Sequence, residues 1–143
     1  MTYATQNDLV AAFGKEQLLL IADRDNDGVL DADVIDGALV GASSIVDLAT
    51  RGRYALPLSP IDDVIRDIVC DLARTALFGK GTQVPDFVLA RDKAARDLLK
   101  QIATGTMTLS ATLQTVPANP SQALRAEISA EERHFTRDGL KGF

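Results

Sequence analysis

Apolar residues recur every three or four positions through most of the first hundred residues, and this spacing predicts a helical protein. The clearest stretch is 60–77, where Ile, Val and Leu fall on one face of a helix. The same period predicts helices over 32–50 and 85–104, and shorter apolar runs predict helices over 6–13 and 16–22. We therefore expect a mainly α protein built as a compact multi-helix bundle.

Local signals mark the starts of two of these helices. Thr5 followed by Asp8 has the spacing of a capping box, in which the two residues satisfy each other's free backbone amides. Ser59 as N-cap and Pro60 at the first helical position are expected to begin the central helix, because proline tolerates that position.

The period changes after Gly105, where apolar residues alternate with Thr and Ser as in a strand: Met107, Leu109, Ala111 and Leu113. A single strand needs a partner for its backbone groups, either a later piece of the tail or another chain. Pro117 and Pro120 then favour extended backbone. We expect a helical core domain over 1–104 and a C-terminal arm over 105–143 that contains a short β-strand and contacts other subunits or another partner protein. The alternative is that this end folds back onto its own core.

An acidic turn separates the second and third predicted helices. Gly28 in this turn matches the glycine at position 6 of an EF-hand calcium loop, but Val34 replaces the glutamate expected at position 12. The pattern therefore predicts at most a weak Ca²⁺ site. Four carboxylates of the turn match positions 1, 3, 5 and 9 of the loop: Asp23, Asp25, Asp27 and Asp31.

The same turn also has an interpretation without metal. Asp and Asn side chains often accept hydrogen bonds from nearby backbone amides, and glycine supplies the positive φ of a tight turn. Asp31 would then be the N-cap of the next helix, with Leu30 and Ile35 closing a hydrophobic staple. Both interpretations stay open at this point, and the first would make the protein a calcium-responsive helical binding module that uses the 23–31 loop.

Composition narrows the function classes. The net charge of −5 disfavours a surface that binds phosphates tightly, because such surfaces cluster Lys and Arg. No leader or membrane span is expected from the pattern, so the chain should be made in the cytoplasm. Cys70 is the single cysteine and His134 the single histidine, so no catalytic triad can be assembled and no enzyme is expected.

The last residues combine aromatic or aliphatic anchors with basic groups, a mixture suited to a pocket with an acidic rim. Together with apolar residues of the predicted strand they are the expected partner-binding residues: Met107, Leu109, Leu113, His134, Phe135, Arg137, Leu140 and Phe143.

Several short motifs together resemble the small neck proteins of Mu-like phages and prophages, a family that is similar to the head-tail connector, or adaptor, proteins of long-tailed phages. The resemblance covers nearly the whole chain. The residues that carry it are Tyr3-Ala4-Thr5, Asp8-Leu9, the acidic turn from Asp23 to Gly28, Gly52-Arg53-Tyr54-Ala55-Leu56-Pro57, Cys70-Asp71-Leu72-Ala73-Arg74, Phe135-Thr136-Arg137-Asp138 and Gly142-Phe143.

This resemblance implies a connector-like helical bundle in the neck of a virion. It implies a homo-oligomeric ring, expected to be dodecameric, between the portal protein and a tail-side neck or stopper protein. DNA would pass through the ring without specific binding, which the acidic balance of the chain suits. The resemblance implies no catalytic residue, no cofactor and no membrane contact, and Ca²⁺ is expected only if the acidic turn binds it.

Overall fold

Helix α4 (Asp63–Leu77) is the central helix of the computed structural model, which describes residues 1–79 and 82–115. It packs against α3 (Ala32–Thr50), α5 (Asp86–Thr104) and α1 (Gln6–Phe13). Apolar residues at helical spacing explain this position, because they recur on one face and are buried there: Ile65, Ile68, Val69, Leu72, Ala73 and Leu77.

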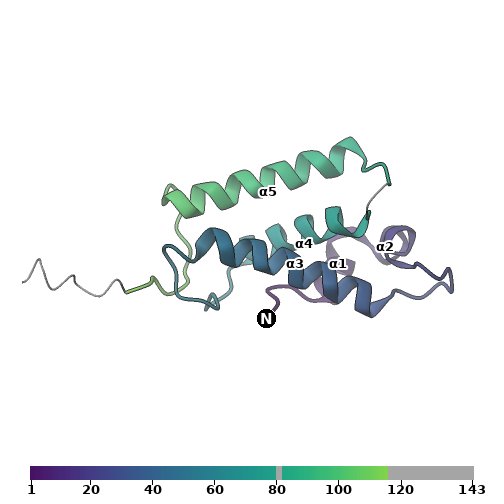
Figure 1. Ribbon diagram of the computed structural model, residues 1–143, viewed down its shortest axis with the longest axis horizontal. Helices are drawn as coiled ribbons and strands as arrows, with labels where there is room; N and C mark the ends of the chain where they lie inside the picture. The colour runs from purple at the N-terminus through teal and green to yellow at the C-terminus, as the bar shows by residue number, and fades with distance from the viewer. Residues whose placement is uncertain (80–81, 116–143) are drawn as a thin grey trace, which may run out of the picture.

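The three long helices α3, α4 and α5 lie side by side, and α1 and α2 (Lys15–Ala22) are grouped near one end of them (Figure 1). The loop between α2 and α3 projects from that same end, whereas the segment after α5 lies at the other end (Figure 1). The expected mainly α bundle is confirmed for the described residues. None of the described helices combines the length and the apolar character needed to cross a bilayer.

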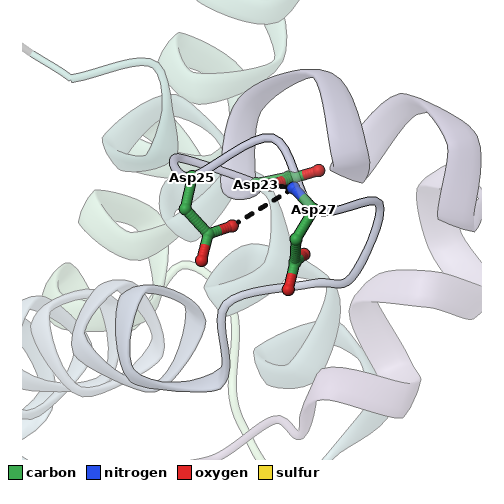
Figure 2. Close-up of side chains that lie close together, drawn as sticks. All are labelled: Asp23, Asp25 and Asp27. Atoms are coloured by element: carbon green, nitrogen blue, oxygen red, sulfur yellow. Dashed lines mark hydrogen bonds between the residues drawn. The ribbon is translucent and has the colours of Figure 1, made fainter.

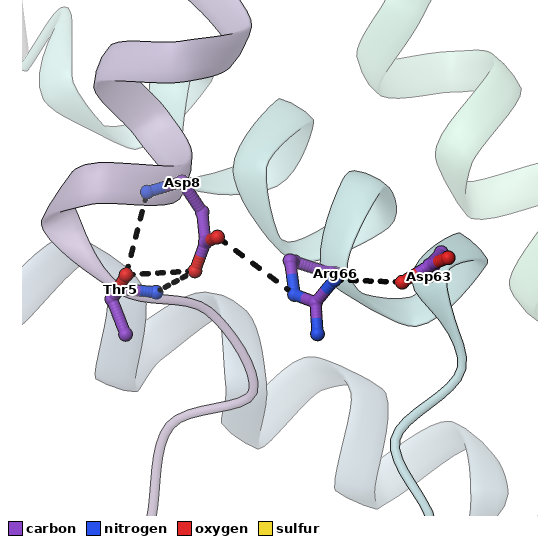
Figure 3. A network of polar contacts seen from close by, with 4 residues as sticks. All are labelled: Thr5, Asp8, Asp63 and Arg66. Atoms are coloured by element: carbon purple, nitrogen blue, oxygen red, sulfur yellow. Dashed lines mark hydrogen bonds and ion pairs between the residues drawn. The ribbon is translucent and has the colours of Figure 1, made fainter.

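The predicted capping box begins α1. The Asp8 backbone N–H donates to Thr5 Oγ1 at 3.3 Å, and the Thr5 N–H donates to Asp8 Oδ2 at 2.7 Å. Arg66 of α4 connects this box to a second helix start, since its Nε lies 3.8 Å from Asp8 Oδ1 and its Nη1 lies 2.7 Å from Asp63 Oδ1 (Figure 3). The box therefore contacts the central helix through Arg66 as well as capping α1.

The predicted start of the central helix at Ser59 and Pro60 is wrong. The helix begins at Asp63, with Asp62 as its N-cap residue. The Ser59 carbonyl instead accepts a hydrogen bond from the Thr112 N–H at 3.1 Å, so it is engaged by a distant segment and not by a helical turn.

The strand predicted over Met107–Leu113 is also wrong, because in the described part of the chain this segment forms no strand and has one isolated antiparallel β-bridge, between Leu113 and Tyr54. Two backbone bonds flank the bridge: Ala55 N–H to Thr112 O at 2.9 Å and Gln114 N–H to Arg53 O at 2.8 Å. The alternating residues therefore do find a backbone partner, but it is the chain's own connector between α3 and α4.

The first part of the predicted arm packs on the core. Ala111 is 5% exposed, and Leu109 packs partly buried against the same apolar cluster. Tyr54, which is 1% exposed, accepts a hydrogen bond at its hydroxyl from the Leu109 N–H at 2.9 Å. The expectation that the core ends at residue 104 is therefore wrong, because residues 105–115 pack on the core and satisfy buried polar groups of the connector between α3 and α4. Contacts of the arm with partners stay a prediction.

Candidate functional site

Three aspartates of the α2–α3 loop come together as the sequence predicts. Each of Asp23, Asp25 and Asp27 offers one carboxylate oxygen, and these oxygens all lie within 4.8 Å of one another (Figure 2). Asp25 and Asp27 are exposed and Asp23 is half-buried. This is the one group among the described residues where three potential metal ligands converge.

The carboxylates also hold the loop through its own backbone. Asp23 uses both oxygens, accepting from the Asp27 N–H at 3.2 Å and from the Gly28 N–H at 2.9 Å. Asp25 Oδ1 accepts from the Asp27 N–H at 3.3 Å, and Asp27 Oδ1 accepts from the Val29 N–H at 2.7 Å. The bonds of Asp25 and Asp27 have the two-residue spacing of Asx turns, and those of Asp23 close the wider loop, so the loop has a structural explanation that needs no metal.

Asp31 lies apart from the group of three. It occupies the N-cap position of α3, but its side chain makes no capping bond; its Oδ2 instead accepts from the Arg24 N–H at 2.9 Å. The predicted side-chain cap is therefore wrong, because the carboxylate turns back to the start of the loop. Leu30 and Ile35, the predicted staple residues, are both buried in the core cluster.

The pKa values of two of the grouped carboxylates are shifted in opposite directions. Desolvation acts to raise the pKa of Asp23, but hydrogen bonds from the Gly28, Asn26 and Asp27 backbone outweigh it and hold this pKa below the ordinary value. Desolvation, followed by the charges of Asp27 and Asp31, raises the pKa of Asp25 despite a backbone hydrogen bond that lowers it. The loop thus concentrates negative charge that a bound cation would relieve.

The donor set suits a hard cation such as Ca²⁺ in its chemistry but is incomplete. Calcium takes six to eight oxygens, and an EF-hand supplies two of them from the glutamate at position 12. That position is the half-buried Val34 of α3, which has no side-chain oxygen. Backbone carbonyls and water would have to complete the shell, so the binding of calcium stays a prediction.

The predicted partner-binding residues divide into three sets. Met107 and Leu113 lie on the surface, with 36% and 58% of their areas exposed. Leu109 is half-buried against the core, so only part of its side chain is open to a partner, and its role as a contact residue stays a prediction. The remaining five lie outside the described residues: His134, Phe135, Arg137, Leu140 and Phe143.

Arg74 is a site residue that its charge alone does not reveal, because an arginine on an amphipathic helix usually lies on the solvated face. Its side chain is buried, with 8% of the residue exposed. The guanidinium carbon lies 4.4 Å from the ring centre of Phe13 and 5.2 Å from that of Phe87. The available signal was its register: Arg74 follows Cys70 by four positions and precedes Leu77 by three, which places it on the buried face.

Two adjoining cavities open beside Arg74, between α2, the end of α4 and the start of α5. One has a volume of about 390 Å³ and includes Arg74, Gln17 and Phe87 in its walls. The other, of about 370 Å³, adds Asp23 and Arg24. Both cavities share four wall residues, which makes them one continuous depression: Leu20, Ile21, Phe78 and Thr82.

Cys70 is not a candidate nucleophile. It is 3% exposed, and burial, followed by the charges of Asp8, Asp67 and Asp71, raises the pKa of its thiol to about 12. A thiol with this pKa stays protonated at neutral pH, and the protonated form is a poor nucleophile.

Comparison with known proteins gives a family. The sequence model of the family described as Bacteriophage Mu, Gp36 matches residues 3–127. Gene product J of Escherichia phage Mu is 34% identical over 74 residues, which is 51% of this chain and 52% of that protein. The chain thus aligns with about half the length of this curated relative.

Proposed function

Because the chain belongs to the Bacteriophage Mu Gp36 family, we propose that it is a structural protein of a phage particle, namely a head-tail connector or adaptor. In this proposal its helical bundle packs side by side with other copies in a ring, expected to be dodecameric. The ring joins the portal protein to a tail-side neck or stopper protein in the neck of the virion. It performs no catalysis, and DNA passes through it.

The observation that carries the proposal is the extent of the family match. Residues 3–127 include all of the described helices and the segment that packs on the connector between α3 and α4. The match to gene product J covers about half of each chain and supports the same relationship. The match shows the family, and we propose the connector role, the ring and the partners on that basis.

Surface chemistry is compatible with side-by-side packing. Exposed apolar side chains lie on α2, α3 and α5, and a ring subunit needs such groups on the faces that meet its neighbours. The largest are Leu20, Val40, Leu48, Phe87 and Leu89. The net charge of −5 suits a channel protein along which DNA must slide, because bound phosphates would hold the DNA in place.

Electron microscopy of purified particles tests this proposal directly. With the protein labelled by a small tag, density should appear as a ring between the portal vertex and the tail. Purified protein mixed with portal should also form a defined complex. Absence of the protein from complete particles would exclude the connector role.

The calcium-responsive module is the second candidate function, favoured by the three converging carboxylates of Asp23, Asp25 and Asp27. Calorimetric titration with Ca²⁺, followed by circular dichroism, separates the two interpretations of this loop. Saturable binding that changes helicity and is lost in Asp25→Ala would support the module. Heat no larger than that of dilution would leave the loop as a purely structural turn.

A further inference from the structure

We propose that the depression between α2, the end of α4 and the start of α5 is a docking site for a partner-protein segment that presents a carboxylate beside a bulky apolar side chain. The site is built on Arg74, with Leu20 and Phe87 at its rim and Phe78 in its wall. The inference does not depend on the connector role, because it is drawn from the pocket alone.

The first step is the charge of Arg74. Its guanidinium donates from Nη2 to the neutral amide oxygen of Gln17 at 3.0 Å, and it forms no ion pair with a carboxylate of the described residues. The nearby Asp71 is engaged by Arg91, whose Nε lies 3.1 Å from its Oδ1. A buried cation is costly without a counter-charge, so a carboxylate brought by a partner would gain a charge-assisted hydrogen bond.

The second step is the fixed position of the guanidinium. Phe13 of α1 and Phe87 of α5 both stack on it, with centroid distances of 4.4 and 5.2 Å. Stacking on aromatic rings restrains a planar group that would otherwise sample many rotamers. Little side-chain entropy therefore remains to be lost when a ligand binds.

The third step is the apolar rim, which decides between a peptide and a small anion. Leu20 is 86% exposed and Phe87 is 58% exposed, although both border the cavity of about 390 Å³. An exposed phenylalanine beside a buried arginine has the aromatic and arginine character that is enriched at protein interfaces, and Leu20 adds apolar area next to it. A free phosphate would leave this rim in water, whereas a bulky side chain next to a carboxylate would cover it.

The test uses the full-length protein and a matched pair of peptides, acetyl-Gly-Glu-Phe-Gly-amide and its Gln counterpart. The Glu peptide should cause saturable NMR shifts of the Leu20 methyl groups and of the Arg74 Nε–H. The Gln peptide should bind about tenfold more weakly, because it lacks the charge that Arg74 recognises. Equal binding of the two peptides, or no saturable shift with either, would overturn the proposal.

Variants separate docking from a purely structural role of Arg74. Leu20→Ser should keep the melting temperature but lose most binding of the Glu peptide. Leu48→Ser is the matched control, since Leu48 is 61% exposed on α3 and does not line the depression. Arg74→Lys should weaken binding severalfold even if its stability also falls, and the Leu20 result decides the matter if that variant does not fold. Unchanged binding by Leu20→Ser, or equal shifts from inorganic phosphate alone, would contradict a peptide site.

Discussion

Two polar corners at opposite ends of the bundle are held in different ways (Figure 1). The connector corner is where residues 53–59, between α3 and α4, meet residues 109–114. There Tyr54 is 1% exposed, and its hydroxyl accepts a hydrogen bond from the backbone N–H of Leu109, which lies 55 positions away in the sequence. At the acidic corner, over residues 23–31, the side-chain hydrogen bonds span at most seven positions and lie in exposed surroundings. The first corner joins distant parts of the chain, and the second shapes only itself.

The two corners should therefore respond differently when a hydrogen-bonding group is removed. A buried polar group that loses its partner pays the full cost of desolvation, whereas an exposed group can exchange its partner for water. The connector corner should therefore tolerate substitution poorly. The acidic corner should tolerate it well, because its exposed carboxylates can exchange their backbone partners for water or for a cation.

Removing the Tyr54 side chain should have the largest effect. Tyr54→Ala would leave a cavity beneath residues 105–115 and should lower the free energy of unfolding by about 3–5 kcal/mol. Urea denaturation followed by circular dichroism would measure it. Tyr54→Phe is the matched control, which keeps the ring and removes only the acceptor for Leu109, at a cost of about 1–2 kcal/mol. Wild-type stability of Tyr54→Ala would mean that the connector corner does not hold the bundle together.

Truncation gives the next largest effect and measures residues 106–115 as a unit. A chain ending at Gly105 should be less stable than one ending at Thr115 by about 2–4 kcal/mol, because it exposes the core beneath Ala111 and leaves the polar groups of the connector unpaired. Thermal melting of the two chains makes the comparison. Identical melting would show that the segment after α5 is not part of the core.

The two corners also explain which features could be predicted from sequence. The capping box at Thr5 and the Asx turns at 25–29 depend on neighbours a few positions away, so short motifs reveal them. The bond between Tyr54 and Leu109 depends on how α3, α4 and α5 pack, which no local motif encodes. The alternation at 107–113 indicates a segment that needs a backbone partner, but it does not show that this partner is the connector between α3 and α4.

The same reasoning applies to Arg74. Its charge favours the solvated face of a helix, and only the positions of Phe13 and Phe87 in space give the guanidinium a buried place. Asp31 is a second example: it occupies the predicted N-cap position of α3, but its side chain makes no capping hydrogen bond there. Local patterns thus predict the position of a residue along a helix better than the direction of its side chain.

Asp8 offers a local motif with a moderate effect. Asp8→Ala removes half of the capping box and should cost about 1 kcal/mol at neutral pH. Side-chain and then backbone hydrogen bonds from Thr5 lower the pKa of Asp8 from its ordinary value of 3.8. Its contribution is therefore present above pH 3.8 and is lost as the pH falls through the folded-state value. Melting of both proteins between pH 7 and pH 2 should show the difference shrinking only at the acidic end.

The smallest effects are expected at the acidic corner, where Asp23→Asn and Asp25→Asn form a matched pair. Asp23 accepts with both carboxylate oxygens, and an amide keeps only one acceptor, so Asp23→Asn should melt slightly lower than the parent in chelator. Asp25 accepts a backbone amide with only one oxygen and is surrounded by like charge, so Asp25→Asn should melt at the same temperature or slightly higher.

The effect of each substitution on the melting temperature should also depend on pH, because the pKa of Asp23 is lowered and the pKa of Asp25 is raised. Asp23, whose folded-state pKa is lowered, stabilises above its ordinary pKa and loses that contribution as the pH falls through the folded-state value. The folded-state pKa of Asp25 is raised, so this residue makes the protein less stable as the pH rises through that value and its carboxyl group ionises. Its replacement should therefore matter most at neutral pH. Added Ca²⁺ then sharpens the comparison: a bound ion should raise the melting temperature of the parent and of neither variant. Equal melting of all three proteins in chelator would contradict the hydrogen-bond account of the loop, and equal responses to Ca²⁺ would show that these carboxylates do not form its binding site.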